Sequence, residues 1–191
     1  MSLLGKLLGR STPPEPTLDQ LFALTDAALT LEAALSLRPT GIGTVAYRAA
    51  EGRASSDVTT DAEALVESGG GPDVERSVDA FGFTWLLLRH DPADTPGLVT
   101  DLHAVNSDLV AAGFGPTLLC SLVALDDGAG HRVGLVYLYK RGTFYPFAPT
   151  GAQTRDTAYE LQVRAAVGSD LPVEPDVSRW FPVWGAPGLT P

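Results

Sequence analysis

Residues 117–145 read TLLCSLVALDDGAGHRVGLVYLYKRGTFY, and this stretch decides the fold class. An apolar run at 117–125 is followed by the turn sequence DDGAG at 126–130 and then by a second run that begins at His131. A connection this short is typical of an antiparallel hairpin. The stretch therefore predicts two paired strands, with Gly142 as a bulge in the returning strand.

Helical patterns flank this hairpin on both sides. Leucines and alanines recur at three- and four-residue steps after Thr17, which together with Gln20 has capping-box spacing, and Pro39 and Gly41 end this helix. A second helix begins at Asp94 or Thr95 and ends at Gly113. Further strands are predicted at 43–49 and 74–90, and further helices at 61–68 and 152–167. This order predicts an α+β fold whose largely antiparallel sheet has helices packed mainly on one face.

The chain divides into three parts by composition. Residues 1–16 are a basic leader followed by the proline-rich linker STPPEP, residues 17–171 form one α+β domain, and residues 172–191 are a tail rich in proline and tryptophan that is expected to dock on the domain. The leader resembles a short amphipathic helix and predicts contact with an anionic membrane surface. Its membrane-contact residues would be Leu3, Leu4, Lys6, Leu7, Leu8 and Arg10. A frayed terminus, or one that packs on its own body, is the alternative interpretation of this leader.

Aromatic and cationic side chains gather in the returning strand and in the tail. Alternation places Val136 and Leu138 on the core side of the strand and Tyr137, Tyr139 and Arg141 on a half-exposed side. Tyrosine and arginine are favoured at interaction hot spots, as are large aromatics generally. The predicted partner-binding residues are therefore Tyr137, Tyr139, Arg141, Trp180, Phe181 and Trp184. A small-molecule cleft near the same strand, and a purely structural role, remain alternatives.

Composition and spacing argue against several kinds of site. The formal net charge of −10 disfavours nucleic acid as a partner, because phosphate binding needs clustered lysine and arginine. Asp101 and His103 lie two apart on a helix and point in different directions, so no metal site is expected. Cys120 lies in an apolar run, where a thiolate would be disfavoured. No glycine motif matches a nucleotide loop, so neither a cofactor nor catalysis is expected.

Localisation follows from the same kind of reasoning. No apolar run approaches the length of a transmembrane helix, the first residues lack the apolar region of a secretory signal, and a single cysteine cannot form an internal disulfide. These features predict a cytoplasmic protein that contacts the inner membrane face peripherally.

The long sequence runs resemble the PspAB family of actinobacterial PspA-associated proteins, which are encoded near phage-shock-type envelope-stress genes. The segments that carry the resemblance span nearly the whole chain: LLGKLLGR, LRPTGIGTVAYRAAEG, FGFTWLLLRHDP, LVTDLHAVNSDLVAAGFGPTLLCSLVAL, VYLYKRGTFYPFAP and SRWFPVWGAPGL. The resemblance implies an accessory factor of a membrane-stress response whose partner is a PspA-type coiled-coil protein. It carries over no catalytic or ligand residue.

The order of elements is also similar to type III secretion chaperone-like and YbjN-like folds, which implies a binding module that is often dimeric. The expectation from residues and resemblance together is a non-enzymatic interaction protein. A ligand-binding or enzymatic cleft, and a structural homo-oligomer such as a homodimer, remain open.

Overall fold

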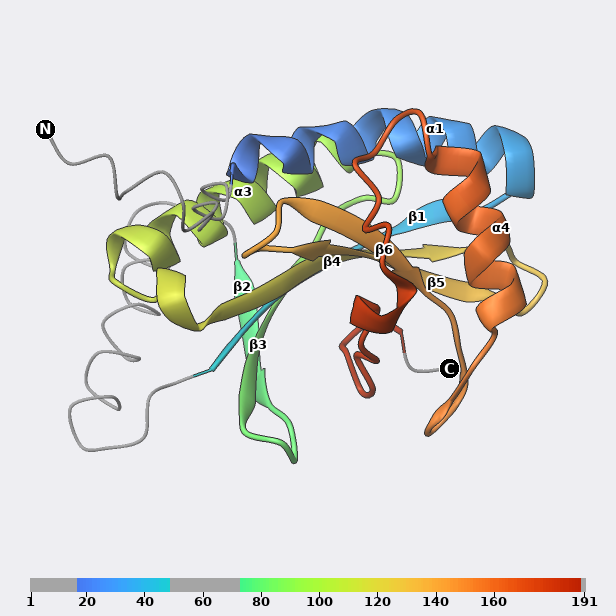
Figure 1. Ribbon diagram of the computed structural model, residues 1–191. Helices are drawn as coiled ribbons and strands as arrows, with labels where there is room; N and C mark the ends of the chain where they lie inside the picture. Colours follow the sequence, from blue (N-terminus) through green and yellow to red (C-terminus); the bar gives the residue numbers. More distant parts are fainter. Residues whose placement is uncertain (1–16, 49–72, 190–191) are drawn as a thin grey trace, which may run out of the picture.

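The computed structural model describes residues 17–48 and 73–189, and within them one antiparallel sheet is the centre of the fold (Figure 1). Its six strands follow the order β2-β3-β1-β4-β5-β6. Their bounds are β1 (Arg38–Arg48), β2 (Val74–Val78), β3 (Phe83–Arg89), β4 (Leu118–Asp126), β5 (Arg132–Leu138) and β6 (Thr143–Phe147). The helices are η2 (Leu18–Ala23), α1 (Leu24–Leu35), α3 (Thr95–Ala111), η3 (Gly115–Thr117), α4 (Thr157–Val167) and η4 (Val177–Arg179). Strands β7 (Pro149–Gly151) and β8 (Thr154–Arg155) form a small separate ribbon. The molecule is therefore α+β, as predicted.

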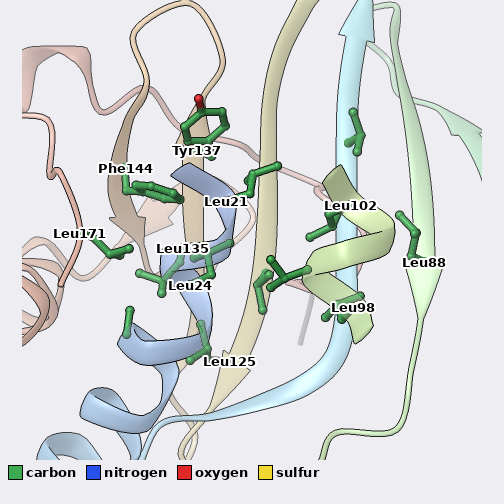
Figure 2. Packing of buried hydrophobic residues seen from close by; sticks show 14 of the residues in the cluster. Leu21, Leu24, Leu88, Leu98, Leu102, Leu125, Leu135, Tyr137, Phe144 and Leu171 are labelled. Carbon is green, nitrogen blue, oxygen red and sulfur yellow. The ribbon is translucent and has the colours of Figure 1, made fainter. Parts of the chain in front are cut away.

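Helices α1 and α3 lie over one face of the sheet, and their leucines form the larger apolar core (Figures 1 and 2). Leu24 of α1 and Leu98 and Leu102 of α3 are 2% exposed or less. Helix α3 approaches β1 so closely at Gly43 that a Cβ atom there would lie 2.9 Å from Leu98 Cδ1. The glycine therefore sets how near the helix layer can come to the sheet.

The segment after α4 covers the opposite face of the sheet. It passes along the edge of β6, where Phe144 N donates to Pro172 O and Glu174 N donates to Phe144 O. Figure 1 shows this segment, in red, descending past β6 to the side away from α1. A second apolar cluster then joins the tail to β4, β5 and β6: Leu122, Val136, Tyr145, Phe147, Trp180, Val183, Ala186 and Leu189.

Several predicted elements are confirmed in detail. Strands β4 and β5 pair antiparallel with Cys120 opposite Leu138, so the hairpin around DDGAG is confirmed. The Asp94 side chain accepts a hydrogen bond from Gly97 N at 2.9 Å, which confirms it as the cap of α3. Gly113 follows that helix with a φ of +91°, the left-handed conformation that suits glycine at a helix end.

Other boundaries differ from the predictions. Gly142 is not a bulge in one long strand, because the chain turns there, with a φ of +65°, between β5 and β6. The region 74–90 holds two strands joined by a turn. Strand β1 begins at Arg38 rather than at Gly43, so Pro39 and Gly41 lie in this strand and the preceding helix already ends at Leu35. The Thr17 side chain makes no cap hydrogen bond. The last helix begins at Thr157, since residues 149–155 form the β7–β8 ribbon. The leader 1–16, the helix predicted at 61–68 and most of the loop SGGGPD lie outside the described residues.

Trp180 and Phe181 provide a paired test of how the tail packs. Trp180 is 3% exposed and its Nε1 donates to Glu174 O, whereas Phe181 is 41% exposed. We expect Trp180→Ala to lower the free energy of unfolding by about 3–5 kcal/mol, the usual cost of emptying a buried aromatic site. Phe181→Ala should cost roughly 1 kcal/mol or less. Urea denaturation measures both, and similar small losses would show that the tail adds little to stability.

Candidate functional site

The predicted half-exposed side of β5 lies beneath the helices. Tyr137 has no exposed surface and Tyr139 is 9% exposed, so the expectation that they line an accessible face is wrong. The Tyr137 hydroxyl donates to Thr17 O at 3.0 Å, at the start of η2. Burial is the main cause that raises the pKa of Tyr137 to about 12. The alternating sequence pattern correctly placed Tyr137 and Tyr139 on the same side of the strand. Both sides of the strand are buried, however, one in each apolar cluster.

Arg141 fastens the tail to the turn between β5 and β6. Its Nε donates to Glu174, whose side chain has no exposed surface, and Thr143 Oγ1 donates to the same carboxylate at 3.1 Å. Burial would raise the pKa of Glu174, but hydrogen bonds from Arg141, the Asp176 backbone and Thr143 hold it below its ordinary value. The ionised form is therefore the one that this contact stabilises.

Trp180 is fixed in the same region by a second buried carboxylate. Glu160, which is 1% exposed, accepts hydrogen bonds from Arg155 Nε, and Arg155 Nη1 donates to Trp180 O at 2.7 Å. The Arg164 guanidinium lies 5.7 Å from the Trp180 ring centroid. Of the three predicted tail aromatics, Trp180 is part of the core, while Phe181 is exposed and Trp184 is half-buried.

An apolar cleft opens beside Trp184, on the face that the tail covers only in part. We call it the aromatic cleft, and its volume is about 260 Å³. It lies between the β2–β3 turn, strands β1, β3 and β4, and the end of the tail. The residues that line it are Ala46, Asp79, Phe81, Phe83, Trp85, Leu119, Cys120, Pro182, Val183 and Trp184.

Asp79 organises the rim of the aromatic cleft. Its Oδ1 accepts hydrogen bonds from the backbone of Phe81 at 2.8 Å and Phe83 at 2.9 Å, and its Oδ2 accepts one from Trp85 Nε1 at 2.9 Å. This turn holds Phe81 outward, where 61% of its surface is exposed. A large aromatic kept in solvent by a well-bonded turn is typical of an interaction surface. Sequence reasoning missed the role of Asp79, although an aspartate opening the turn DAFG is a recognisable signal.

The aromatic cleft suits binding better than chemistry. Its titratable side chains are Asp79, which is engaged by the turn, and Cys120, which is 2% exposed. Burial raises the pKa of Cys120 to about 12, so the thiolate needed for nucleophilic attack does not form near neutral pH. The remaining lining is aliphatic and aromatic.

Three histidines pair with carboxylates on different parts of the molecule: His90 with Asp101, His103 with Asp19, and His131 with Asp127. The His90 Nε2 to Asp101 Oδ2 distance is 2.7 Å, and this contact joins the end of β3 to α3. Across residues 17–48 and 73–189, no three His, Cys, Asp or Glu side chains gather in a metal-binding arrangement. The same part of the chain contains no helix long and apolar enough to cross a bilayer.

Comparison with known families gives one result. The family model PspAB, described as PspA associated protein B, matches residues 1–188. The chain belongs to the PspAB family. No curated protein and no solved structure matches the chain, so the similarity to chaperone-like and YbjN-like folds stays a prediction. The family is named for association with PspA, and its description names no reaction.

The buried state of Cys120 leads to a simple labelling test. In the native protein at pH 8, we expect Cys120 to resist iodoacetamide, because both access and thiolate formation are suppressed. The same thiol should react readily once the chain is unfolded in guanidinium. Mass spectrometry of the intact protein measures both reactions. Rapid labelling of the folded protein would show that the floor of the aromatic cleft is open and reactive.

Proposed function

We propose that this PspAB-family chain is a non-enzymatic accessory protein of a PspA-type envelope-stress response, acting through protein–protein contact. The family description supports the association with PspA. The observation that best supports the proposal is the aromatic cleft. Phe81, which lines it, is 61% exposed, and Val78, which precedes Asp79 of its rim, is 56% exposed. Exposed aromatics around an apolar hollow are a common arrangement for anchoring a partner side chain.

The partner segment that we propose for the aromatic cleft is one face of a helix. PspA-type proteins are coiled-coil by the resemblance described above, and helices present apolar side chains at three- and four-residue steps. A volume of about 260 Å³ lies just below the range of about 300–1,000 Å³ that is usual for small-molecule sites. It suits one or two partner side chains better than a whole cofactor. Of the predicted partner-binding residues, Trp184 lines this surface. Phe181 is exposed but packs against Tyr145 of β6, and Trp180 and Arg141 hold the tail in place.

Leader contact with an anionic membrane surface is the second part of the proposal. Lys6 and Arg10 are the only charged residues in the first ten, so the rest of the chain carries a formal charge of −12. An acidic body is repelled from anionic lipid, and the basic leader is the segment suited to reach it. This arrangement would place the protein at the cytoplasmic face of the membrane, where PspA-type proteins act.

Phe81 provides a test of the partner surface. We expect Phe81→Ser to weaken binding to the PspA-type protein of the same genome by about tenfold or more, as for removal of an aromatic hot spot. The control is Leu161→Ser, because Leu161 is 44% exposed but lies on α4, away from the aromatic cleft. Isothermal titration calorimetry of the three chains measures the affinities. Equal affinities of all three chains would show that the aromatic cleft is not the binding surface. No binding by the unchanged chain would show that the PspA-type protein is not its partner.

The leader is tested with vesicles. Co-sedimentation should show more of the full chain than of residues 17–191 on vesicles rich in anionic lipid, because each cation near such a surface contributes about 1 kcal/mol. The difference should shrink on neutral vesicles and at high salt, where charge attraction is screened. Equal and negligible binding by both chains would contradict membrane contact.

A further inference from the structure

A second apolar groove lies on the helical side of the molecule, away from the aromatic cleft. It runs between α1 and the loop that leads into α3, with a volume of about 530 Å³. Leu29 of α1 stands at this groove with 65% of its surface exposed. Ala28, Pro39 and Pro96 are among the other apolar residues that line it. We call this the helical groove.

A second exposed apolar side chain, Phe22, lies on η2 toward the start of the described chain. Phe22 precedes Leu29 by seven residues, a spacing that places both on one helical face. Phe22 is 46% exposed, and its ring lies 5.0 Å from that of His103 on α3. These two large apolar side chains, with the polar Thr25 and Asp26 between them, therefore mark one exposed stripe with the helical groove at one end.

The surroundings of this stripe are acidic. Residues 17–35 and 90–111, which build the two helices and the loop into α3, contain seven aspartates and glutamates and no lysine or arginine. Arg38 is the basic residue at the helical groove, and its Nε is paired with Glu32 at 2.8 Å. An apolar stripe in so negative a field favours an occupant that is both apolar and cationic.

One segment of this chain has that chemistry. Residues 1–10 contain Leu3, Leu4, Leu7 and Leu8 at helical spacing and carry a charge of +2 from Lys6 and Arg10. We propose that this leader docks on its own body, with its leucines on the Phe22–Leu29 stripe and in the helical groove and its cations facing the surrounding carboxylates. Docked in this way, the leader would hide the same leucines that the proposed membrane contact would use.

The length of the linker allows this placement. Residues 11–16, which separate the leader from Thr17, span up to roughly 19 Å at about 3.1 Å per residue in an extended proline-rich chain. The path from Thr17 along η2 and α1 to Leu29 is roughly 21 Å, at about 2.0 Å per residue in a 3-10 helix and 1.5 Å in an α-helix. A leader that turns back at the linker therefore reaches the whole of the stripe. The short tether also favours the leader of the same chain over that of a second copy, because the effective concentration of a short-tethered segment is high.

Paramagnetic NMR on the full chain tests the docking without lipid or partner. A nitroxide is attached to the cysteine of the Ser2→Cys variant. The unsubstituted chain, treated with the same reagent, is the control for any nitroxide that reacts with the buried Cys120. We expect amide signals of residues 22–32 and 93–95 to lose most of their intensity, while those of the β2–β3 turn, residues 79–82, keep theirs. Leu29→Ser, and separately Lys6→Glu with Arg10→Glu, should restore the lost signals. Leu161→Ser, a matched exposed substitution on α4, should not.

The outcomes separate the possible occupants. If the groove signals keep their intensity, or if broadening is uniform over the surface, docking is overturned. A mixture of unlabelled ¹⁵N chain with spin-labelled ¹⁴N chain should show no broadening, and broadening there would mean that the leader of a second copy occupies the helical groove, which also overturns the proposal. Because no vesicle and no PspA-type protein is present, the result is independent of whether the proposed function holds.

Discussion

The structure depends on the need to cover an apolar sheet on both faces. Strands β4, β5 and β6 carry large buried side chains on each side, with Tyr137 and Phe144 toward the helices and Tyr145 and Phe147 toward the tail. Each such side chain stabilises the fold by about 1.5–3 kcal/mol when it is removed from water. The helices can cover only one face, so the last residues of the chain act as a structural layer on the other.

The way in which the helices and the tail divide the sheet between them also decides which apolar surface stays exposed. The described tail residues pack against β4, β5 and β6 and reach Ile42 of β1, while the side near β3 stays open as the aromatic cleft. On the other side, α1 and α3 meet the sheet with their leucine stripes, while Phe22 of η2 and Leu29 of α1 point outward. The two exposed apolar regions thus lie on opposite faces and differ in surroundings, which allows separate occupants.

Much of the architecture followed from local patterns, whereas the surroundings of individual side chains did not. The DDGAG turn and the Asp94 cap are local signals, and both were predicted from sequence. A period of two shows which side chains share a face but not what covers that face, so Tyr137 was assigned to an accessible side that η2 and α1 in fact cover. The contact of Tyr137 with Thr17 spans 120 residues, and no local pattern encodes it.

Buried charges in the tail explain why one aromatic points inward and its neighbour outward. Apolar contacts alone would let the tail shift by one residue along the apolar face of the sheet, because the hydrophobic effect is not directional. Two ion pairs fix the tail in place, one between Glu174 and Arg141 and the other between Glu160 and Arg155. Arg155 also donates a hydrogen bond to Trp180 O. Such pairs add little net stability but penalise a shifted register heavily, because a shift leaves a buried carboxylate unpaired. The charges therefore specify the register of the tail, and with it the exposure of Phe181 and the position of Trp184 in the aromatic cleft.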